Sequence, residues 1–111
     1  MTKEELQAYV TQKMAKGHIY QPAILTTLLE NNGKASVRTI AERCSKVTGK
    51  SPEPFEKSLM KYPKEALSKS GVVSVHGRDF ILNCRISDLD ELTVSRLLEL
   101  TISAMNRFSP S

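Results

Sequence analysis

The chain reads VVSVHGRDFIL at residues 72–82, and this stretch decides the fold. Two runs rich in apolar and β-branched residues, 72–75 and 80–82, flank the short polar segment HGRD, which contains a glycine. Two such runs separated by a polar turn predict a β-hairpin. Because a single hairpin cannot bury both of its faces, we expect it to pack against helices.

Four segments before the hairpin and one after it carry apolar residues at helical spacing. We expect helices at about 3–16, 22–31, 37–48, 52–70 and 88–108. Helix starts are indicated by a capping box at Thr2 and by Ser36, and helix ends by Gly17 and Gly49. Pro63 is expected to kink or restart the fourth helix near residue 62, with a last turn or two over 64–70.

The last helix is expected to begin at Ser87, with Asp90 as its capping-box partner. Its apolar residues predict one broad side made by Leu92, Leu97, Leu98, Ile102, Met105 and Phe108.

The three helices expected directly before the hairpin, followed by the hairpin itself, have the order of a winged helix-turn-helix. The sequence therefore predicts a mainly α fold with a small β-hairpin (α+β), built as a winged helix with additional N- and C-terminal helices. No repeat and no Pro/Gly/Ser-rich linker divides the 111 residues, so we expect one domain over 1–111. Its core would span about 18–84, and its flanking helices about 3–16 and 88–108.

Positive charge is concentrated in the middle of the chain. The net charge is +4, yet residues 34–78 hold ten of the 16 Lys and Arg side chains and only four of the 12 acids. Localised basic charge is typical of a phosphate-binding surface. A solvated, lysine-rich face without a partner explains the charge equally well, so charge alone leaves both interpretations open.

The charge and the fold order together predict binding to double-stranded DNA. In a winged helix, the helix before the hairpin enters the major groove and the hairpin tip touches the adjoining backbone. Here that helix is about 52–70, and its Lys57, Lys61 and Lys64 recur at i, i+4 and i+7 on one face. The residues expected to contact DNA are Arg38, Arg43, Lys50, Ser51, Lys57, Ser58, Lys61, Lys64 and Arg78.

Lysine is a point charge that holds phosphate better than it reads bases. Base readout would fall to Ser58, Lys57 or Lys61, which the sequence does not rank. Lys50 and Ser51 precede the helix, where backbone amides favour a phosphate.

Little in the sequence indicates catalysis. Cys44 and Cys84 lie far apart, outside any metal-ligand spacing, so we expect reduced, half-buried thiols and neither a metal nor a cofactor. Asp88 and Asp90 resemble a carboxylate dyad, but acids in the first turn of a helix are explained by capping and by the helix dipole. We therefore expect no enzymatic site in this chain.

The N-terminus has acids where a signal peptide would be basic, and no apolar run approaches the ~20 residues of a membrane span. These features predict a cytoplasmic protein without a membrane partner.

Two further features have alternative interpretations. Tyr20-Gln21-Pro22, an aromatic residue beside a proline at a helix start, is typical of a packing staple, and a pocket for an unusual base is the alternative. The broad apolar sides of the terminal helices indicate packing on the core or, alternatively, a protein-interaction surface that forms a homodimer.

Several stretches resemble a known family: YQPAILTTLLE at 20–30, GKAS at 33–36, Ile40-Ala41, Tyr62-Pro63, Leu67 and GVV at 71–73. The pattern resembles the winged-helix module attached to prokaryotic HNH and other restriction-type nucleases. It is also similar in outline to the HARE-HTH and Mrr N-terminal winged helices, which end in a hairpin like HGRDF at 76–80. The resemblance covers roughly 18–84.

This resemblance implies a DNA-binding module of a restriction or anti-phage system, or a regulator. The nuclease motifs of the family, a His-Asn-His arrangement or an Asp…Glu-x-Lys cluster, do not occur in the sequence. Cleavage would therefore belong to a separate nuclease domain or subunit.

Overall fold

The structure, a computed structural model, describes residues 1–61 and 67–110. The described residues form an α+β fold that is mainly helical with a small three-stranded antiparallel sheet. The elements are α1 (Lys3–Ala8), η1 (Tyr9–Lys13), α2 (Tyr20–Glu30), β1 (Lys34–Ser36), α3 (Val37–Thr48), α4 (Glu53–Leu59), β2 (Val73–His76), β3 (Asp79–Leu82), η2 (Ile86–Asp88) and α6 (Glu91–Asn106). Residues 67–69 are also helical.

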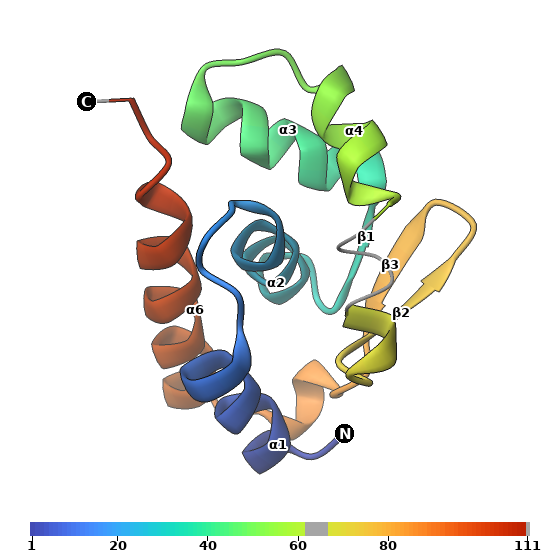
Figure 1. Cartoon of the computed structure of the whole chain (residues 1–111). Coiled ribbons are helices and arrows are strands. Elements are labelled where there is room, and N and C mark those ends of the chain that lie inside the picture. Colours follow the sequence, from blue (N-terminus) through green and yellow to red (C-terminus); the bar gives the residue numbers. More distant parts are fainter. Residues whose placement is uncertain (62–66, 111) are drawn as a thin grey trace.

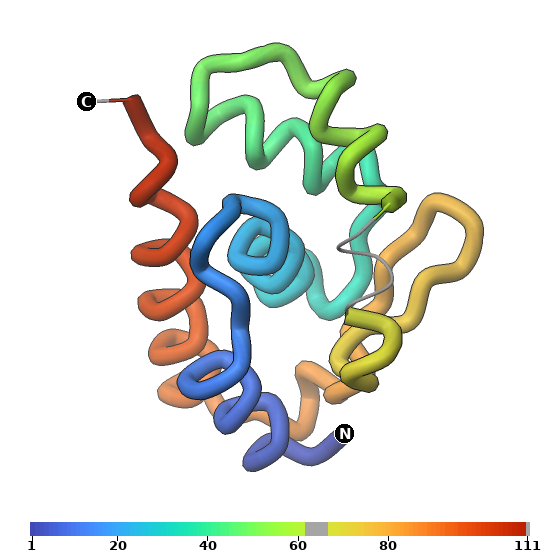
Figure 2. The backbone as a smooth tube through the Cα atoms, viewed as in Figure 1, coloured from blue at the N-terminus to red at the C-terminus, as the bar shows by residue number. Residues whose placement is uncertain are grey.

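Helix α2 is the centre of the molecule. Figures 1 and 2 show α2 enclosed by α6, by α3 and by the sheet, and residues 21–29 are all buried. A helix that is apolar on every side belongs in a core rather than at a surface. The rest of the chain is therefore wrapped around this helix, and the elements on its α3 side carry the candidate site.

The sheet has the strand order β1-β3-β2. The predicted hairpin is confirmed: β2 pairs with β3, and Gly77 supplies the positive φ of +63° at the turn. The sequence predicted no third strand, but residues 34–36 form strand β1, which pairs with β3 so that Ala35 lies opposite Phe80. Phe80 is fully buried, and its position in the central strand lets it pack beneath both neighbours.

Local capping signals correctly predicted two helix starts and one helix end. The Thr2 hydroxyl accepts a hydrogen bond from the Glu5 amide at 3.1 Å, and the Glu5 carboxylate accepts one from the Thr2 amide at 3.1 Å. Ser36 caps α3 through the amide of Thr39 at 3.1 Å. Gly49 ends α3 with a φ of +76°, a conformation that glycine adopts without steric cost.

Other predicted boundaries were wrong. The first helix ends at Lys13, before the expected Gly17, because the main chain leaves the helical region at Met14, whose side chain turns into the core. Helix α4 ends at Leu59, whereas a continuous helix was expected to about residue 62; the helical residues 67–69 agree with the last turn expected over 64–70, and the kink or restart expected at Pro63 lies outside the described residues.

The start of the last helix also differs from the prediction. Asp90, not Ser87, caps α6, and its carboxylate accepts a hydrogen bond from the Thr93 amide at 2.7 Å. Ser87 lies in the separate short helix η2, which ends so that Leu89 can turn into the core. Leu92 was expected on the apolar side of α6, yet it is 63% exposed.

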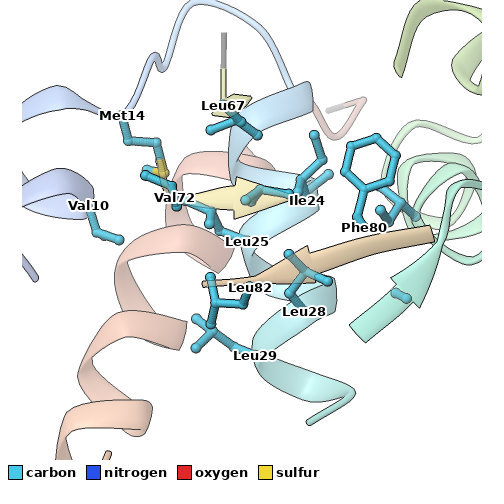
Figure 3. Packing of buried hydrophobic residues seen from close by; sticks show 14 of the residues in the cluster. Val10, Met14, Ile24, Leu25, Leu28, Leu29, Leu67, Val72, Phe80 and Leu82 are labelled. Carbon is cyan, nitrogen blue, oxygen red and sulfur yellow. The ribbon is translucent and has the colours of Figure 1, made fainter. Parts of the chain in front are cut away.

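One hydrophobic cluster joins the helices to the sheet, as Figure 3 shows for the side chains around Ile24, Leu67 and Phe80. A polar contact ties the N-terminal helix to this core: the buried Gln21 carboxamide oxygen accepts hydrogen bonds from the Tyr9 hydroxyl and the Ala15 amide, both at 2.8 Å. Within residues 1–61 and 67–110, every helix is too short or too polar to cross a bilayer.

Candidate nucleic-acid interface

The tip of the hairpin is held against the start of α3. The amide of Val37 donates a hydrogen bond to the carbonyl oxygen of Arg78 at 2.8 Å. Val37 is fully buried, so this bond joins the turn to a rigid position in the core. The hairpin tip is therefore tied to the start of α3 on one side, while residues 76–78 themselves are exposed to solvent.

Glu56 of α4 connects three elements. Its carboxylate accepts hydrogen bonds from Arg78 Nη2 at 2.8 Å and from Arg38 Nη1 at 3.1 Å. The Glu56 side chain is only 19% exposed, whereas the side chains of Arg38 and Arg78 are 46% and 64% exposed. Glu56 thus brings α3, α4 and the hairpin tip together, with the two arginines on the solvent side.

The arginines in this cluster are largely neutralised. Arg38 also lies 3.6 Å from Glu42 and 3.6 Å from Glu53. The hydrogen bond that Arg38 donates to Glu56 and the charges of the three carboxylates raise the pKa of Arg38 above its usual value. Two arginines therefore face three acids, and a phosphate would have to compete with carboxylates that are already in place.

Glu56 was not predicted as a site residue. Its partners Arg38 and Arg78 are 18 and 22 positions away in the sequence. No local spacing rule reaches that far, so only the assembled fold reveals this contact.

The predicted lysine row along one helical face is not present in α4. Lys57 is exposed and lies within α4, but Lys61 follows the end of the helix, in a turn where its amide donates to the Ser58 carbonyl oxygen at 3.2 Å. Lys64 lies outside the described residues. Ser58 is half-buried beside the buried Leu59, which makes it a poorer candidate for base contact than Lys57 or Lys61.

The entrance to α4 is also less suited to phosphate than expected. Lys50 and Ser51 are exposed in the loop between α3 and α4, but α4 has only seven residues. Proline occupies positions 52 and 54, which removes two backbone donors, and Glu53 and Glu56 stand in the first turn. The acids already interact with the positive end of the helix dipole. Lys50 therefore depends on its own charge for any phosphate contact.

Arg43 faces another part of the molecule. Its guanidinium lies 3.3 Å from Glu30 at the end of α2, and both residues line a polar hollow between α2 and α3. Arg43 was predicted to add a backbone contact to DNA, but it is engaged away from the hairpin tip.

Four lysines on the α3–α4 side remain exposed without an ion pair to any residue in the described ranges: Lys46, Lys50, Lys57 and Lys61. Lys46 was not among the predicted contacts, although it contributes to the charge excess of the middle segment. The positive charge available on the α3–α4 side is therefore carried by lysines. Six other exposed cations without an ion pair among the described residues lie elsewhere on the molecule: Lys13, Lys16, Lys69, Arg85, Arg96 and Arg107.

The cysteines are more deeply buried than expected. Cys44 and Cys84 are both almost inaccessible to solvent, and burial raises the pKa of the Cys44 thiol to about 12. Burial likewise raises the pKa of Cys84. Both thiols are protonated at neutral pH and act as small apolar side chains. Across the described ranges, no three His, Cys, Asp or Glu residues are grouped as metal ligands.

Comparison of the chain with protein-family models, with curated proteins and with solved structures found no match.

Proposed function

We propose that this chain is a winged-helix module that binds double-stranded DNA through α4, the α3–α4 loop and the hairpin tip. The order α2-β1-α3-α4-β2-β3 and the sheet order β1-β3-β2 support a winged helix, in which a hairpin stands beside a short helix. The resemblance to modules of restriction-type nucleases supports a role in such a system or in regulation, with any cleavage carried out by another domain or subunit.

The contact of Glu56 with Arg38 and Arg78 carries the proposal. Through this contact the hairpin tip lies directly beside α4, and the exposed Lys57 follows Glu56 on that helix. A helix and a hairpin tip on one surface can follow a groove and the adjoining phosphates together. The exposed lysines nearby would supply sequence-independent affinity by releasing counterions.

Duplex affinity measured as a function of salt tests this proposal. We expect the affinity of the whole chain for a dye-labelled duplex to fall as salt rises, because each neutralised phosphate contributes a slope of about −0.9 in log K against log salt. In the variant Lys57→Glu/Lys61→Glu, affinity should fall and the slope should become shallower.

The variant Lys13→Glu/Arg96→Glu is the matched control. It changes the net charge by the same amount, but its two exposed positions lie on η1 and α6. The proposal requires this control to bind DNA much more tightly than the α4-side variant. Equal losses in the two variants, or an affinity that ignores salt, would contradict the proposal.

A second candidate is a homodimer formed through the terminal helices. Two large apolar side chains of α6, Leu92 and Leu100, are 63% and 43% exposed, which favours a partner on this helix. The inner side of α6, however, packs within the molecule, where Leu97 and Met105 are buried. Any partner of α6 would therefore have to use the exposed leucines and not the broad apolar side.

Sedimentation of the full chain and of the variant Leu92→Gln/Leu100→Gln separates the two situations. A dimer that dissociates in the variant supports this second candidate, whereas a monomeric full chain contradicts it. Deleting α6 would be a poor test, because it would remove Leu97 and Met105 from the core and unfold the chain.

A further inference from the structure

Aromatic side chains from three separate parts of the chain meet in a pocket of about 440 Å³ beside the proposed DNA-binding surface. His18 and Tyr20 come from the start of α2, Phe55 comes from α4, and Phe108 follows α6. Figures 1 and 2 show the segment after α6 reaching toward the end of α3, which supplies Thr48 to the same pocket. Pockets of this size accommodate small organic groups.

The rings are packed together but remain partly open to solvent. The centroids of Tyr20 and Phe55 lie 6.4 Å apart in an edge-to-face arrangement, and those of His18 and Tyr20 lie 5.4 Å apart. His18, Tyr20, Phe55 and Phe108 are all half-buried, so each leaves part of its surface available for contact. The expected packing role of Tyr20 therefore accounts for only part of its ring.

The charge of the pocket favours an anionic, planar ligand. Among the lining residues that the structure describes, Lys50 is exposed and is the one charged side chain, and none carries a carboxylate side chain. Aromatic surfaces stack on nucleobases irrespective of sequence, and a neighbouring lysine holds the phosphate that accompanies each base. A nucleotide combines both features, a flat π-face and one negative charge.

The pocket is also suitably placed. Lys50 and Phe55 belong to the α3–α4 loop and to α4, which the proposed function puts against DNA. A base that leaves the stack of a bound duplex would therefore emerge close to the pocket, and its own phosphate would lie near Lys50.

We infer that this pocket binds a nucleobase that has left the DNA stack, with the base on Tyr20, Phe55 and Phe108 and its phosphate at Lys50. This inference rests on the proposed function, because it assigns one step in the recognition of the same DNA. Its consequence is a preference for DNA that contains an unpaired base over DNA that is fully paired.

Three duplexes of the same sequence test the inference by fluorescence anisotropy. One is fully paired, one carries a single bulged thymidine, and one carries an abasic residue at the bulge. The bulged duplexes bend and open alike, so their difference isolates the base itself. We expect the chain to bind the thymidine bulge about tenfold more tightly than the abasic bulge, in line with the stacking of one base on aromatic side chains.

Two variants locate the effect. Phe108→Ala and Tyr20→Leu should each remove most of the tenfold preference while leaving the affinity for the fully paired duplex within about twofold. The affinity for the fully paired duplex also shows whether each variant is folded. Because residues 20 and 108 lie near opposite ends of the chain, one variant can still test the inference if the other misfolds. Lys50→Gln should weaken binding to both bulged duplexes.

The outcomes separate this inference from the proposed function. If all three duplexes bind but the thymidine and abasic bulges are equivalent, the pocket does not bind a base, and the proposed function stands. If none of the duplexes binds, both fail. A preference for thymidine that persists in both aromatic variants also overturns the inference, because the base must then be held elsewhere.

Discussion

Neutralising Glu56 should make DNA binding tighter and more dependent on salt. In the native chain Glu56 accepts hydrogen bonds from Arg38 and Arg78, and the cluster holds two arginines against three acids. The variant Glu56→Gln removes one of these acids and the charge-assisted partner that both arginines share. The guanidinium group of Arg78 then becomes available to phosphates, whereas Arg38 remains beside Glu42 and Glu53.

The size of the effect follows from the number of arginines released. Each arginine that neutralises a phosphate steepens the slope of log K against log salt by about 0.9, and the variant releases one, Arg78. Between about 50 mM and about 200 mM salt, a fourfold change, the additional slope corresponds to an additional loss of affinity of about 3.5-fold. At the lower salt concentration the variant should bind more tightly than the native chain.

The assay is anisotropy titration of a labelled duplex at four or more salt concentrations, with circular dichroism to verify the fold. Glu99→Gln on α6 is the matched control, because it removes the same charge from an exposed acid on another element and should leave the slope unchanged. A slope in Glu56→Gln that is equal to or shallower than the native slope would refute the reasoning. It would mean that Arg78 does not exchange carboxylate for phosphate.

Three further predictions concern stability and reactivity. Gln21→Leu should lower the free energy of unfolding by about 2–4 kcal/mol in urea titration, because it leaves the Tyr9 hydroxyl and the Ala15 amide without their hydrogen-bond acceptor. A loss of stability no larger than that of Tyr9→Phe would contradict this prediction. Alkylation of native Cys44 at pH 8 should be negligible, since its pKa of about 12 leaves about one thiol in ten thousand ionised, and rapid labelling without denaturant would disprove it. Hydrogen bonds with the Thr93 side chain and with the Thr93 amide lower the pKa of Asp90 from 3.8, so its contribution to stability is present above pH 4 and is lost as pH falls through the lowered value. The variant Asp90→Asn, which keeps a capping side chain, should lose that part of the acid sensitivity, and identical pH profiles would argue against it.

Features that depend on adjacent residues were predicted well from the sequence. Ser36 and Gly49 bound α3, and the hairpin with its turn at Gly77 forms as expected. Each of these depends on hydrogen bonds or backbone angles within a few residues. At the start of α6 two local caps competed, and Asp90 prevailed over Ser87 because Leu89 is drawn into the core.

Features that depend on distant partners were not predictable. Strand β1 is only three residues long and becomes a strand because β3, more than 40 residues later in the chain, pairs with it. The lysine row failed in a similar way: the periodicity of Lys57 and Lys61 requires a helix that continues past Leu59, and α4 ends there. The convergence of Tyr20, Phe55 and Phe108 on one pocket had no signal in the sequence, because the three lie on separate elements.

By itself the sequence determined the helices, the hairpin and the excess of positive charge between residues 34 and 78. The tertiary structure alone decided which of those charges remain available. Arg38, Arg43 and Arg78 are engaged by carboxylates, whereas Lys50 and Lys57 stay exposed without such a partner among the described residues. Electrostatic interactions act across space over a few ångströms, so charges far apart in the chain neutralise one another only once folding has brought them together.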